Sequence, residues 1–437
     1  MADTLDDSDK SLVPQPLKAY LVAFSHPGES PSLTHALLRE LSELVQTQGL
    51  QVVGSQTAKI REYNPSTIIG SGKVREIIAE AEHLHAQVIV CDDVLSPAQQ
   101  RNWEHGTSIA VIDRQEVILE IFAHRAQTRE ARLQVQLAQA NYELPRLVRK
   151  WTHLGRQRGA AGGLGGRAGG EQQLELDSRV IRKRIQWLNE ELATVRRQRK
   201  VQRSLRLRRP VPVVAIVGYT NAGKSSLLNR LTHAGVLVED KLFATLDPTV
   251  RRLPLPGGQE VLLADTVGFV RKLPHLLIEA FKSTLEETSL ADYILEVLDA
   301  SDPELEAHHD TTTEVLSELQ CGGKPSLLVL NKWDLADETR RAELKALYPE
   351  AIPVSVLTGE GLPGLLSQLS TRVKGLMPQR RYIIPHQRYD ILAQIRRSCF
   401  IEREEFLDDG IHITARVPDT SPECWEEFCN PPHSVEI

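Results

Sequence analysis

The residues with the clearest chemical meaning form a glycine-rich loop near the middle of the chain. The stretch Gly218-Tyr-Thr-Asn-Ala-Gly-Lys-Ser225 matches the pattern G-x-x-x-x-G-K-[ST] and lies between an apolar run and a helical run. Glycines let backbone N–H groups wrap around phosphates, and the following helix N-terminus adds partial positive charge. The loop predicts a nucleoside-phosphate site contacted by Gly218, Tyr219, Thr220, Asn221, Ala222, Gly223, Lys224, Ser225 and Ser226.

Metal and γ-phosphate chemistry is predicted from this loop together with a second motif. Lys224 would reach the β- and γ-phosphates, and the Ser225 hydroxyl would ligate Mg²⁺. Asp265-Thr-Val-Gly268 follows the apolar run 261–264, so we expect Asp265 to hold Mg²⁺ through water and Gly268 to contact the γ-phosphate. A strand-ending turn is the alternative interpretation of this short motif. The predicted contacts there are Asp265, Thr266, Val267 and Gly268.

A third motif predicts which base the site accepts. Asn331-Lys-Trp-Asp334 follows the apolar run 327–330. The Asp334 carboxylate can accept both guanine N1–H and N2–H₂, whereas adenine would leave that carboxylate unpaired. Asn331 can tie neighbouring loops together, and the stem of Lys332 can cover the base. Ser355, Val356 and Leu357 would complete the base pocket through backbone groups, unless they form a plain turn.

Two features bear on hydrolysis. A switch threonine must close on Mg²⁺ and the γ-phosphate, and spacing alone does not choose between Thr245 and Thr249. Phe269 follows Gly268 where a Ras-like template has a glutamine that orients the attacking water. We therefore predict slow intrinsic hydrolysis unless a partner or an ion supplies the missing group. Lys224, Thr245 and Gly268 are the candidate catalytic residues.

The elements that must position these residues alternate between strand and helix. Apolar runs and helical spacing predict a small α/β domain from residue 18 to 112, and a parallel sheet covered on both faces from 211 to 375. The segment from about 380 to 437 predicts a helix at 389–397 and strands at 399–407 and 411–417. The fold class is α/β, with a Ras-like P-loop domain.

A helical hairpin is predicted between these two domains. Leu133, Leu137, Ala140, Leu144 and Leu147 repeat in steps of four and three, as do Ile181, Ile185, Leu188, Leu192 and Val195. We expect the first helix to end or kink near Leu144, because Pro145 removes a backbone donor. Residues 159–170 include seven glycines and predict a flexible tip, with Arg156, Arg158 and Arg167 making it basic.

Composition limits the class of protein. The net charge is −6, but twelve Lys and Arg between residues 179 and 209 face only Glu190 and Glu191, so this block favours a polyanionic partner. Five cysteines without a C-x-x-C pair predict reduced thiols. With no apolar run long enough to span a bilayer, we expect a cytoplasmic protein without an integral membrane segment, peripheral membrane association being left open. His308 and His309 are interpreted as surface or helix residues without a metal.

These boundaries define five predicted parts. They are a disordered tail (1–16), an N-terminal α/β domain (17–114), an antiparallel helical hairpin with a Gly-rich basic tip (115–209), a P-loop GTPase domain (210–376) and a small α+β C-terminal domain (377–437).

The sequence resembles the HflX family of GTPases over most of residues 18–375. The resemblance extends well beyond the nucleotide motifs. It is carried by Ile69-Gly-Ser-Gly-Lys73, Leu95-Ser-Pro-Ala-Gln-Gln-Arg-Asn102, Asp113-Arg114, Ile121-Phe-Ala-His-Arg125-Ala, Thr128-Arg-Glu130, Leu133-Gln-Val-Gln-Leu-Ala138, Leu144-Pro-Arg-Leu147, Phe243-Ala-Thr-Leu-Asp-Pro-Thr249 and Asp265-Thr-Val-Gly-Phe269. At the tip the chain departs from the family pattern, with Gly166-Arg-Ala-Gly-Gly-Glu171 lacking a proline and Ser178 replacing an arginine.

The resemblance implies a ribosome-associated GTPase. Family members bind the large ribosomal subunit and its rRNA, insert the hairpin tip toward the peptidyl-transferase region, and split stalled or idle ribosomes, with GTPase activity that rises on the ribosome. It further implies that Thr245 is the Mg²⁺-linked switch threonine and that Asn221 is a K⁺ ligand. ATP binding by the N-terminal domain of some members draws attention to Gly70–Lys73, which the residues alone favour as a plain turn.

Two other function classes stay open from the sequence. One is an ATP-driven RNA remodeller that works through residues 18–112 with GTP as a regulator. The other is a protein-binding module in which the hairpin is a coiled coil and GTP changes only its angle. Neither explains the combination of a guanine site with a basic, glycine-tipped hairpin as directly as rRNA binding does.

Overall fold

The computed structural model describes residues 16–158, 165–206, 211–233, 235, 242–256, 259–272, 287–417 and 423–430. Two compact units make up the chain. One comprises Met1–Ile121 with Pro145–Leu174, and the other comprises Phe122–Leu144 with Glu175–Ile437. The second unit carries all the nucleotide motifs.

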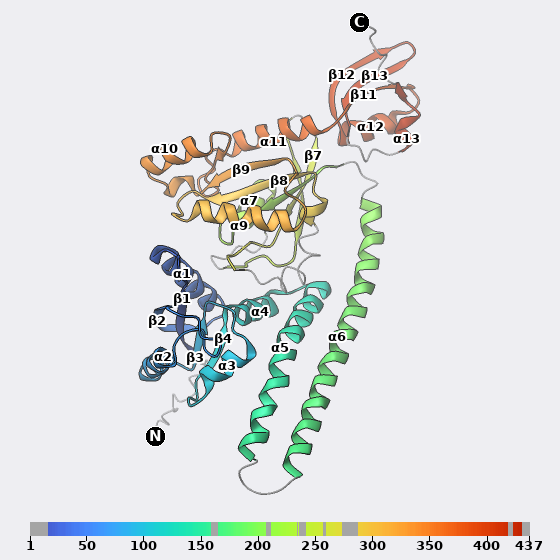
Figure 1. Ribbon diagram of the computed structural model, residues 1–437. Coiled ribbons are helices and arrows are strands. Elements are labelled where there is room, and N and C mark those ends of the chain that lie inside the picture. The colour runs from blue at the N-terminus through green and yellow to red at the C-terminus, as the bar shows by residue number, and fades with distance from the viewer. Residues whose placement is uncertain are drawn as a thin grey trace, which may run out of the picture. The chain divides into compact units, whose positions relative to one another are not determined.

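The N-terminal region folds as a small parallel sheet with the order β2-β1-β3-β4 (Figure 1). The central strand β1 is buried along almost its whole length, as its continuous apolar sequence predicts. Strand and helix alternate as expected for a doubly wound sheet. The elements are β1 (Lys18–Ser25), α1 (Pro31–Thr47), β2 (Gln51–Lys59), α2 (Ser71–His83), β3 (Val88–Cys91), α3 (Pro97–Glu104), β4 (Ala110–Asp113) and α4 (Arg114–Arg125).

The second sheet has six strands in the order β10-β9-β8-β5-β7-β6. Five of them are parallel, as expected, whereas β6, a strand that was not predicted from the sequence, pairs antiparallel with β7 at the edge. An edge strand needs no long apolar run, and β6 exposes Arg251 and Arg252 there. The strands are β5 (Val213–Val217), β6 (Thr249–Pro254), β7 (Glu260–Asp265), β8 (Tyr293–Asp299), β9 (Ser326–Asn331) and β10 (Ile352–Pro353).

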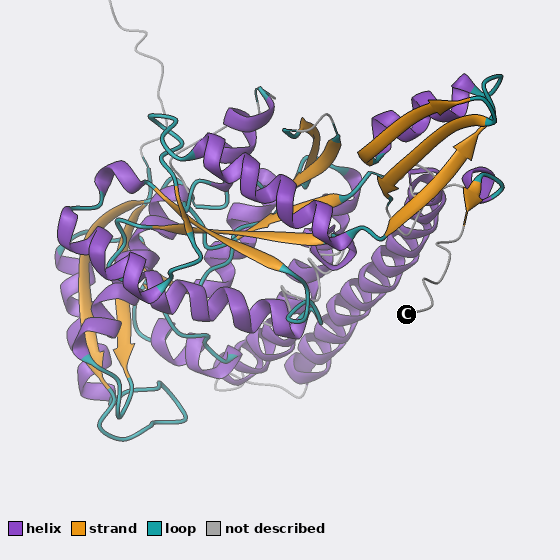
Figure 2. Cartoon of the chain, turned by 90° about the horizontal axis from the view of Figure 1, so that it is seen from above, coloured by secondary structure: helices purple, strands orange, loops and turns teal. Residues whose placement is uncertain are grey.

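Alternate residues of the central strands face two separate cores. Leu295 and Val297 of β8 join the cluster that contains α7 (Lys224–Thr232) and α11 (Leu362–Leu376). Leu298 joins the cluster that contains α9 (Leu305–Glu318) and α10 (Glu338–Leu347). Helices therefore cover both faces of the sheet (Figure 2). Strands buried on both sides need nearly continuous apolar sequence, which is why they could be predicted.

The predicted hairpin consists of α5 (Arg129–Arg158) and α6 (Gly165–Arg206). Leu133 of α5 packs against Leu188 and Leu192 of α6, so the pairing predicted from the heptads is confirmed there.

Two expectations about the hairpin need correction. We expected the first helix to end or kink near Leu144, and the expected end is wrong, because α5 continues through Pro145. An interior proline costs about 3 kcal/mol, and Arg146 offsets this by binding Gln100, the Leu95 carbonyl and Asp113. The glycine-rich stretch is also partly helical, because α6 begins at Gly165 as the first turn of a long helix.

The C-terminal region is a four-stranded antiparallel sheet with the order β12-β13-β11-β14. Its hairpin turns at Gly410, whose φ of +146° and close approach to the Ile384 carbonyl exclude a side chain. The predicted helix and both predicted strands are present. The elements are β11 (Gln379–Ile384), α12 (Tyr389–Ser398), β12 (Phe400–Leu407), β13 (Gly410–Arg416), α13 (Glu423–Glu426) and β14 (Cys429–Asn430).

Candidate nucleotide-binding site

Three parallel strands of the six-stranded sheet, β5, β7 and β9, lead into the residues predicted to bind nucleotide. The loop after β5 carries Gly218–Ser225, β7 ends at Asp265, and β9 ends at Asn331. The carboxyl ends of parallel strands meet at one edge of a sheet, which is where open α/β sheets bind ligands.

Two glycines shape the loop because no side chain fits at either position. Gly218 has a φ of +140°, and a Cβ there would lie 2.2 Å from the Val297 carbonyl oxygen. Gly223 has a φ of +94°, and a Cβ there would lie 2.2 Å from the Asn331 Nδ2. The second contact brings the phosphate loop directly against the predicted guanine motif.

Lys224 is buried at the start of α7 and donates from Nζ to the Tyr219 carbonyl oxygen over 2.6 Å. Burial lowers the pKa of this ammonium to about 8, although the charge of Asp265 acts in the opposite direction. A Cβ at Gly268 would lie 2.8 Å from the same Nζ. The Lys224 ammonium and the backbone of Gly268 therefore face the same small volume.

Three oxygen-bearing side chains converge beside that lysine. The Ser225 Oγ donates to the Asp265 Oδ2 over 2.6 Å and lies 2.7 Å from the Thr245 Oγ1. Burial raises the pKa of the Asp265 carboxyl, and its Oδ1 is buried without a hydrogen-bond partner among the described residues. Hydroxyl and carboxylate oxygens are the ligands that Mg²⁺ prefers, so these residues fit that ion. Thr249 instead opens β6, paired with Asp265 in the ladder.

The guanine motif is tied to both neighbouring loops by one amide. Asn331 donates from Nδ2 to the Ala222 carbonyl over 2.9 Å, and its Oδ1 accepts the Val356 N–H over 3.2 Å. Lys332 adopts a left-handed backbone, and its Nζ lies 2.7 Å from Asp299 at the end of β8. The buried Ser355 accepts the Thr358 N–H, which fixes the last of the three loops.

Phe269 lies in the interior rather than at the phosphate side. Its side chain is 1% exposed, and its backbone pairs with the phosphate loop. The Thr220 N–H donates to the Phe269 carbonyl over 2.8 Å, and the Phe269 N–H donates to the Gly218 carbonyl over 3.1 Å. A side chain held in this way does not orient a water molecule.

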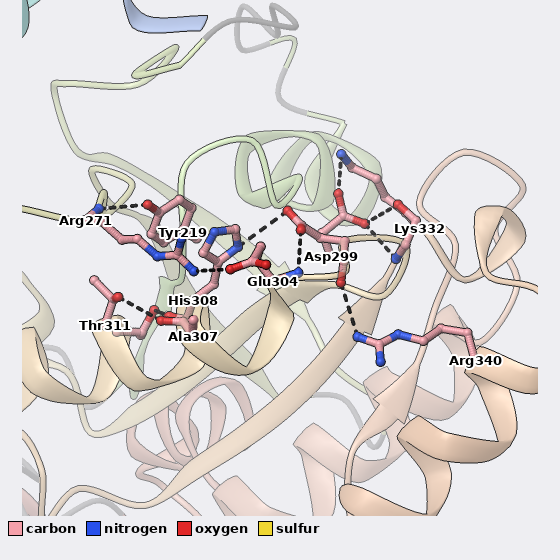
Figure 3. Close-up of polar contacts among 12 residues, drawn as sticks. Tyr219, Arg271, Asp299, Glu304, Ala307, His308, Thr311, Lys332 and Arg340 are labelled. Atoms are coloured by element: carbon pink, nitrogen blue, oxygen red, sulfur yellow. Dashed lines mark hydrogen bonds and ion pairs between the residues drawn. The ribbon is translucent and has the colours of Figure 1, made fainter. Parts of the chain in front are cut away.

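One contact of the loop was missed from the sequence. The Tyr219 ring stacks on His308 with centroids 3.6 Å apart, and its hydroxyl accepts the Arg271 N–H over 2.7 Å (Figure 3). Arg271 in turn binds Glu304 over 2.8 Å. His308 does lie on helix α9, but it packs against the nucleotide loop instead of being a plain surface residue. No local sequence signal links residues so far apart in the chain.

A cavity of about 670 Å³ opens over these residues. The residues that were predicted from the sequence and that line this cavity are Thr220, Asn221, Gly223, Lys224, Ser225, Ser226, Thr245, Thr266, Gly268, Asn331, Lys332, Asp334, Val356 and Leu357. The cavity is also lined by four residues that were not predicted from the sequence, namely Arg230, Phe243, Ala244 and Leu335. Six predicted residues do not line the cavity and lie in the loops and the strand that frame it: Gly218, Tyr219, Ala222, Asp265, Val267 and Ser355.

The structure gives less support to the candidate residues outside the nucleotide motifs. Lys73 binds Glu76 within the same helix over 2.6 Å, an arrangement that fits the plain-turn interpretation of Gly70–Lys73. The side chains of Arg156, Arg158 and Arg167 lie outside the described residues. Across the part of the chain that the structure describes, no group of three or more His, Cys, Asp or Glu side chains is placed to hold a metal ion. Within the same residues, no helix is long and apolar enough to cross a bilayer.

Four family models match successive parts of the chain. They are described as GTP-binding GTPase N-terminal (residues 35–123), GTP-binding GTPase Middle Region (125–206), 50S ribosome-binding GTPase (213–332) and HflX C-terminal domain (341–426). Together they span most of the chain.

Similar proteins match over nearly their whole length. A GTPase HflX from Akkermansia muciniphila is 45% identical over 411 residues, covering 92% of this chain and 94% of that protein. A GTPase HflX from Escherichia coli is 41% identical, covering 90% and 91%. Among solved structures, a GTP-binding protein from Sulfolobus solfataricus in complex with GDP is 25% identical, with a TM-score of 0.42 over 82% of this chain and 99% of that one.

Proposed function

The chain belongs to the HflX family of GTPases, and we propose that it acts on the large ribosomal subunit, where GTP controls the splitting or rescue of stalled or idle ribosomes. The observation that carries this proposal is the match of residues 213–332 to a 50S ribosome-binding GTPase, in a chain that also carries a long basic helical hairpin. The GTPase activity would be stimulated by the ribosome.

The charge of α6 supports an rRNA partner. Arg182, Lys183 and Arg184 are exposed on consecutive positions of the helix. Of the two opposing acids, Glu191 binds Arg129 of α5, so it neutralises little of this charge. Rows of phosphates bind such a surface electrostatically and release counterions when they do so.

Co-sedimentation with purified large subunits tests the proposal. We expect binding with a GTP analogue that weakens at least about tenfold between 50 and 200 mM salt. Replacing Arg182, Lys183 and Arg184 together by alanine should weaken binding and flatten this salt dependence. Replacing three exposed cations of the C-terminal region, Arg388, Arg396 and Arg403, is the matched control. If the affinity for large subunits changed neither with salt concentration nor in the α6 variant, the electrostatic part of the proposal would be contradicted.

We assign the hydrolytic roles as follows. Lys224 binds the β- and γ-phosphates, Gly268 contacts the γ-phosphate through its N–H, and Ser225 and Thr245 hold Mg²⁺, with Asp265 acting through water. When bound, Mg²⁺ neutralises charge on the transferring phosphoryl group. The Phe269 side chain is buried and cannot position the attacking water. The ribosome is therefore expected to complete the site.

Asp334 is assigned as the guanine reader. Asp334→Asn replaces a carboxylate acceptor by a donor opposite guanine N1–H, so GTP affinity should fall at least about a hundredfold. Fluorescent-nucleotide titration measures this, with Asp337→Asn as a control that lies outside the cavity. GTP binding by Asp334→Asn as tight as that of the unmodified protein would contradict the assignment. The K⁺ role of Asn221 and ATP binding by the N-terminal domain rest on resemblance alone and stay predictions.

A further inference from the structure

A single carboxylate joins the segment after α7 to the beginning of the hairpin. The Asp247 Oδ2 accepts the Gln127 N–H over 2.9 Å and the Thr128 N–H over 3.1 Å. Its Oδ1 accepts the Thr128 hydroxyl over 2.5 Å. These donors directly precede α5, where the orphan N–H groups and the helix dipole favour a negative charge.

A second contact lies beside the first. Phe122 of α4 meets Phe243 edge-on, with ring centroids 4.5 Å apart at 71°. Both rings are buried, at 1% and 2% exposure. An apolar contact and a charged one therefore hold the same short segment, residues 243–247, against the last turn of α4 and against two of the three residues that link α4 to α5. None of these contacts follows from the nucleotide motifs.

The threonine predicted to hold Mg²⁺ lies between these two contacts. Thr245 is two residues from Phe243 and two from Asp247, and its Oγ1 is 2.7 Å from the Ser225 Oγ. Two residues of extended chain reach only about 7 Å. A movement of Thr245 toward or away from the metal site must therefore strain or shift both anchors.

We propose that Asp247 is a positioning residue for GTP hydrolysis, which couples Thr245 to the first turn of α5. A ribosome that engages the hairpin then changes the placement of Thr245, and the nucleotide state changes the order of the α5 N-terminus. The ribosomal half of this coupling rests on the proposed function, whereas the nucleotide half does not.

The first test needs no ribosome. Hydrogen exchange at residues 127–132 is measured with GDP and with a GTP analogue. We expect the exchange rates in the two states to differ at least about fivefold, and this difference to disappear in Asp247→Asn and in Thr128→Val. Asp337→Asn is the matched control, because Asp337 caps α10 in the same way, accepting the Arg340 N–H over 2.7 Å away from the cavity. Equal exchange in both nucleotide states of the unmodified protein would overturn the proposal.

The second test uses large subunits and single-turnover hydrolysis. In Asp247→Asn the stimulation, taken as the rate with subunits divided by the rate without them, should fall at least about tenfold, while GDP affinity and subunit binding stay within about twofold. The double variant with Thr128→Val should be no worse than Asp247→Asn alone, because the hydroxyl contact that Thr128→Val removes is one of the three contacts that Asp247→Asn weakens. Full stimulation of Asp247→Asn, or additive losses, would overturn the coupling. Failure of the unmodified protein to bind subunits would refute the proposed function and leave the exchange result to decide the inference.

Discussion

At the scale of single residues, Lys224 is buried at the position where an anionic ligand would bind. Its ammonium is buried, and burial lowers its pKa to about 8. Only the protonated form attracts phosphate. Phosphate bound beside it raises the pKa again, so nucleotide binding must take up a proton when the pH exceeds about 8.

The direction of this proton uptake predicts how nucleotide affinity depends on pH. Nucleotide should bind about threefold more weakly at pH 8.5 than at pH 7.5, because a rising pH removes the binding form of the free protein. Calorimetry in buffers of different ionisation enthalpy should show about half a proton taken up per GDP at pH 8. Lys224→Met should show no such uptake. Proton release, or no exchange at pH 8 in the unmodified protein, would contradict this account of Lys224.

Phe269 gives a second prediction. Restoring the glutamine of the Ras-like template by Phe269→Gln should not raise the basal hydrolysis rate, because this position points into the core and its backbone is paired with the phosphate loop. Burying an amide without partners there should destabilise the domain by about 1–3 kcal/mol instead. Single-turnover hydrolysis without ribosomes measures the rate. A gain of tenfold or more would show that Phe269 faces the attacking water.

Much of the site could be predicted because its motifs are local. The residues at Gly218–Ser225 and Asn331–Asp334 are close in sequence, so their types and order reveal the chemistry. The stacking of Tyr219 on His308 could not be predicted, since it depends on how α9 packs beside the loop. Spacing left Thr245 and Thr249 equivalent, and only the family resemblance favoured Thr245. The fold separates them, because the Thr245 hydroxyl lies beside Ser225 whereas Thr249 begins β6.

At the scale of elements, burial decided which strands could be predicted. The strands β5, β8 and β9 are apolar nearly throughout because helices cover them on both faces. Strand β6 lies at the sheet edge and carries exposed arginines, so its sequence shows no comparable run. The helix α5 was predicted to end or kink near Leu144, because a proline rule for isolated helices does not count the tertiary contacts of Arg146; the helix continues through Pro145.

The hairpin seam gives a prediction about one helix. Leu188 is fully buried against Leu133, so Leu188→Ala should leave a cavity and cost about 2–4 kcal/mol. Amide exchange in residues 181–195 should then accelerate at least about thirtyfold. Leu176→Ala is the control on the same helix, because Leu176 is 54% exposed. Equal acceleration in both variants would mean that exchange there does not depend on pairing with α5.

At the scale of the whole molecule, the chain joins a guanine-nucleotide site to a basic hairpin through a short shared segment. The phosphate loop, the Ser225 and Thr245 hydroxyls proposed to hold Mg²⁺, and the guanine motif meet at one cavity, and residues 243–247 connect that cavity to the start of α5. Under the proposed function, an rRNA partner bound to the hairpin would complete a site in which the buried Phe269 side chain cannot position the attacking water. The nucleotide state and the binding of the partner would then influence each other through residues 243–247.

The most direct test of this account is sedimentation of intact ribosomes with the protein and different nucleotides. We predict that GTP and a non-hydrolysable analogue both convert intact ribosomes to free subunits, whereas GDP leaves them intact. The analogue should act as well as GTP, because we propose that the GTP-bound form, rather than hydrolysis, drives the separation. Splitting of equal extent with GDP, or no splitting with any nucleotide, would contradict the central claim.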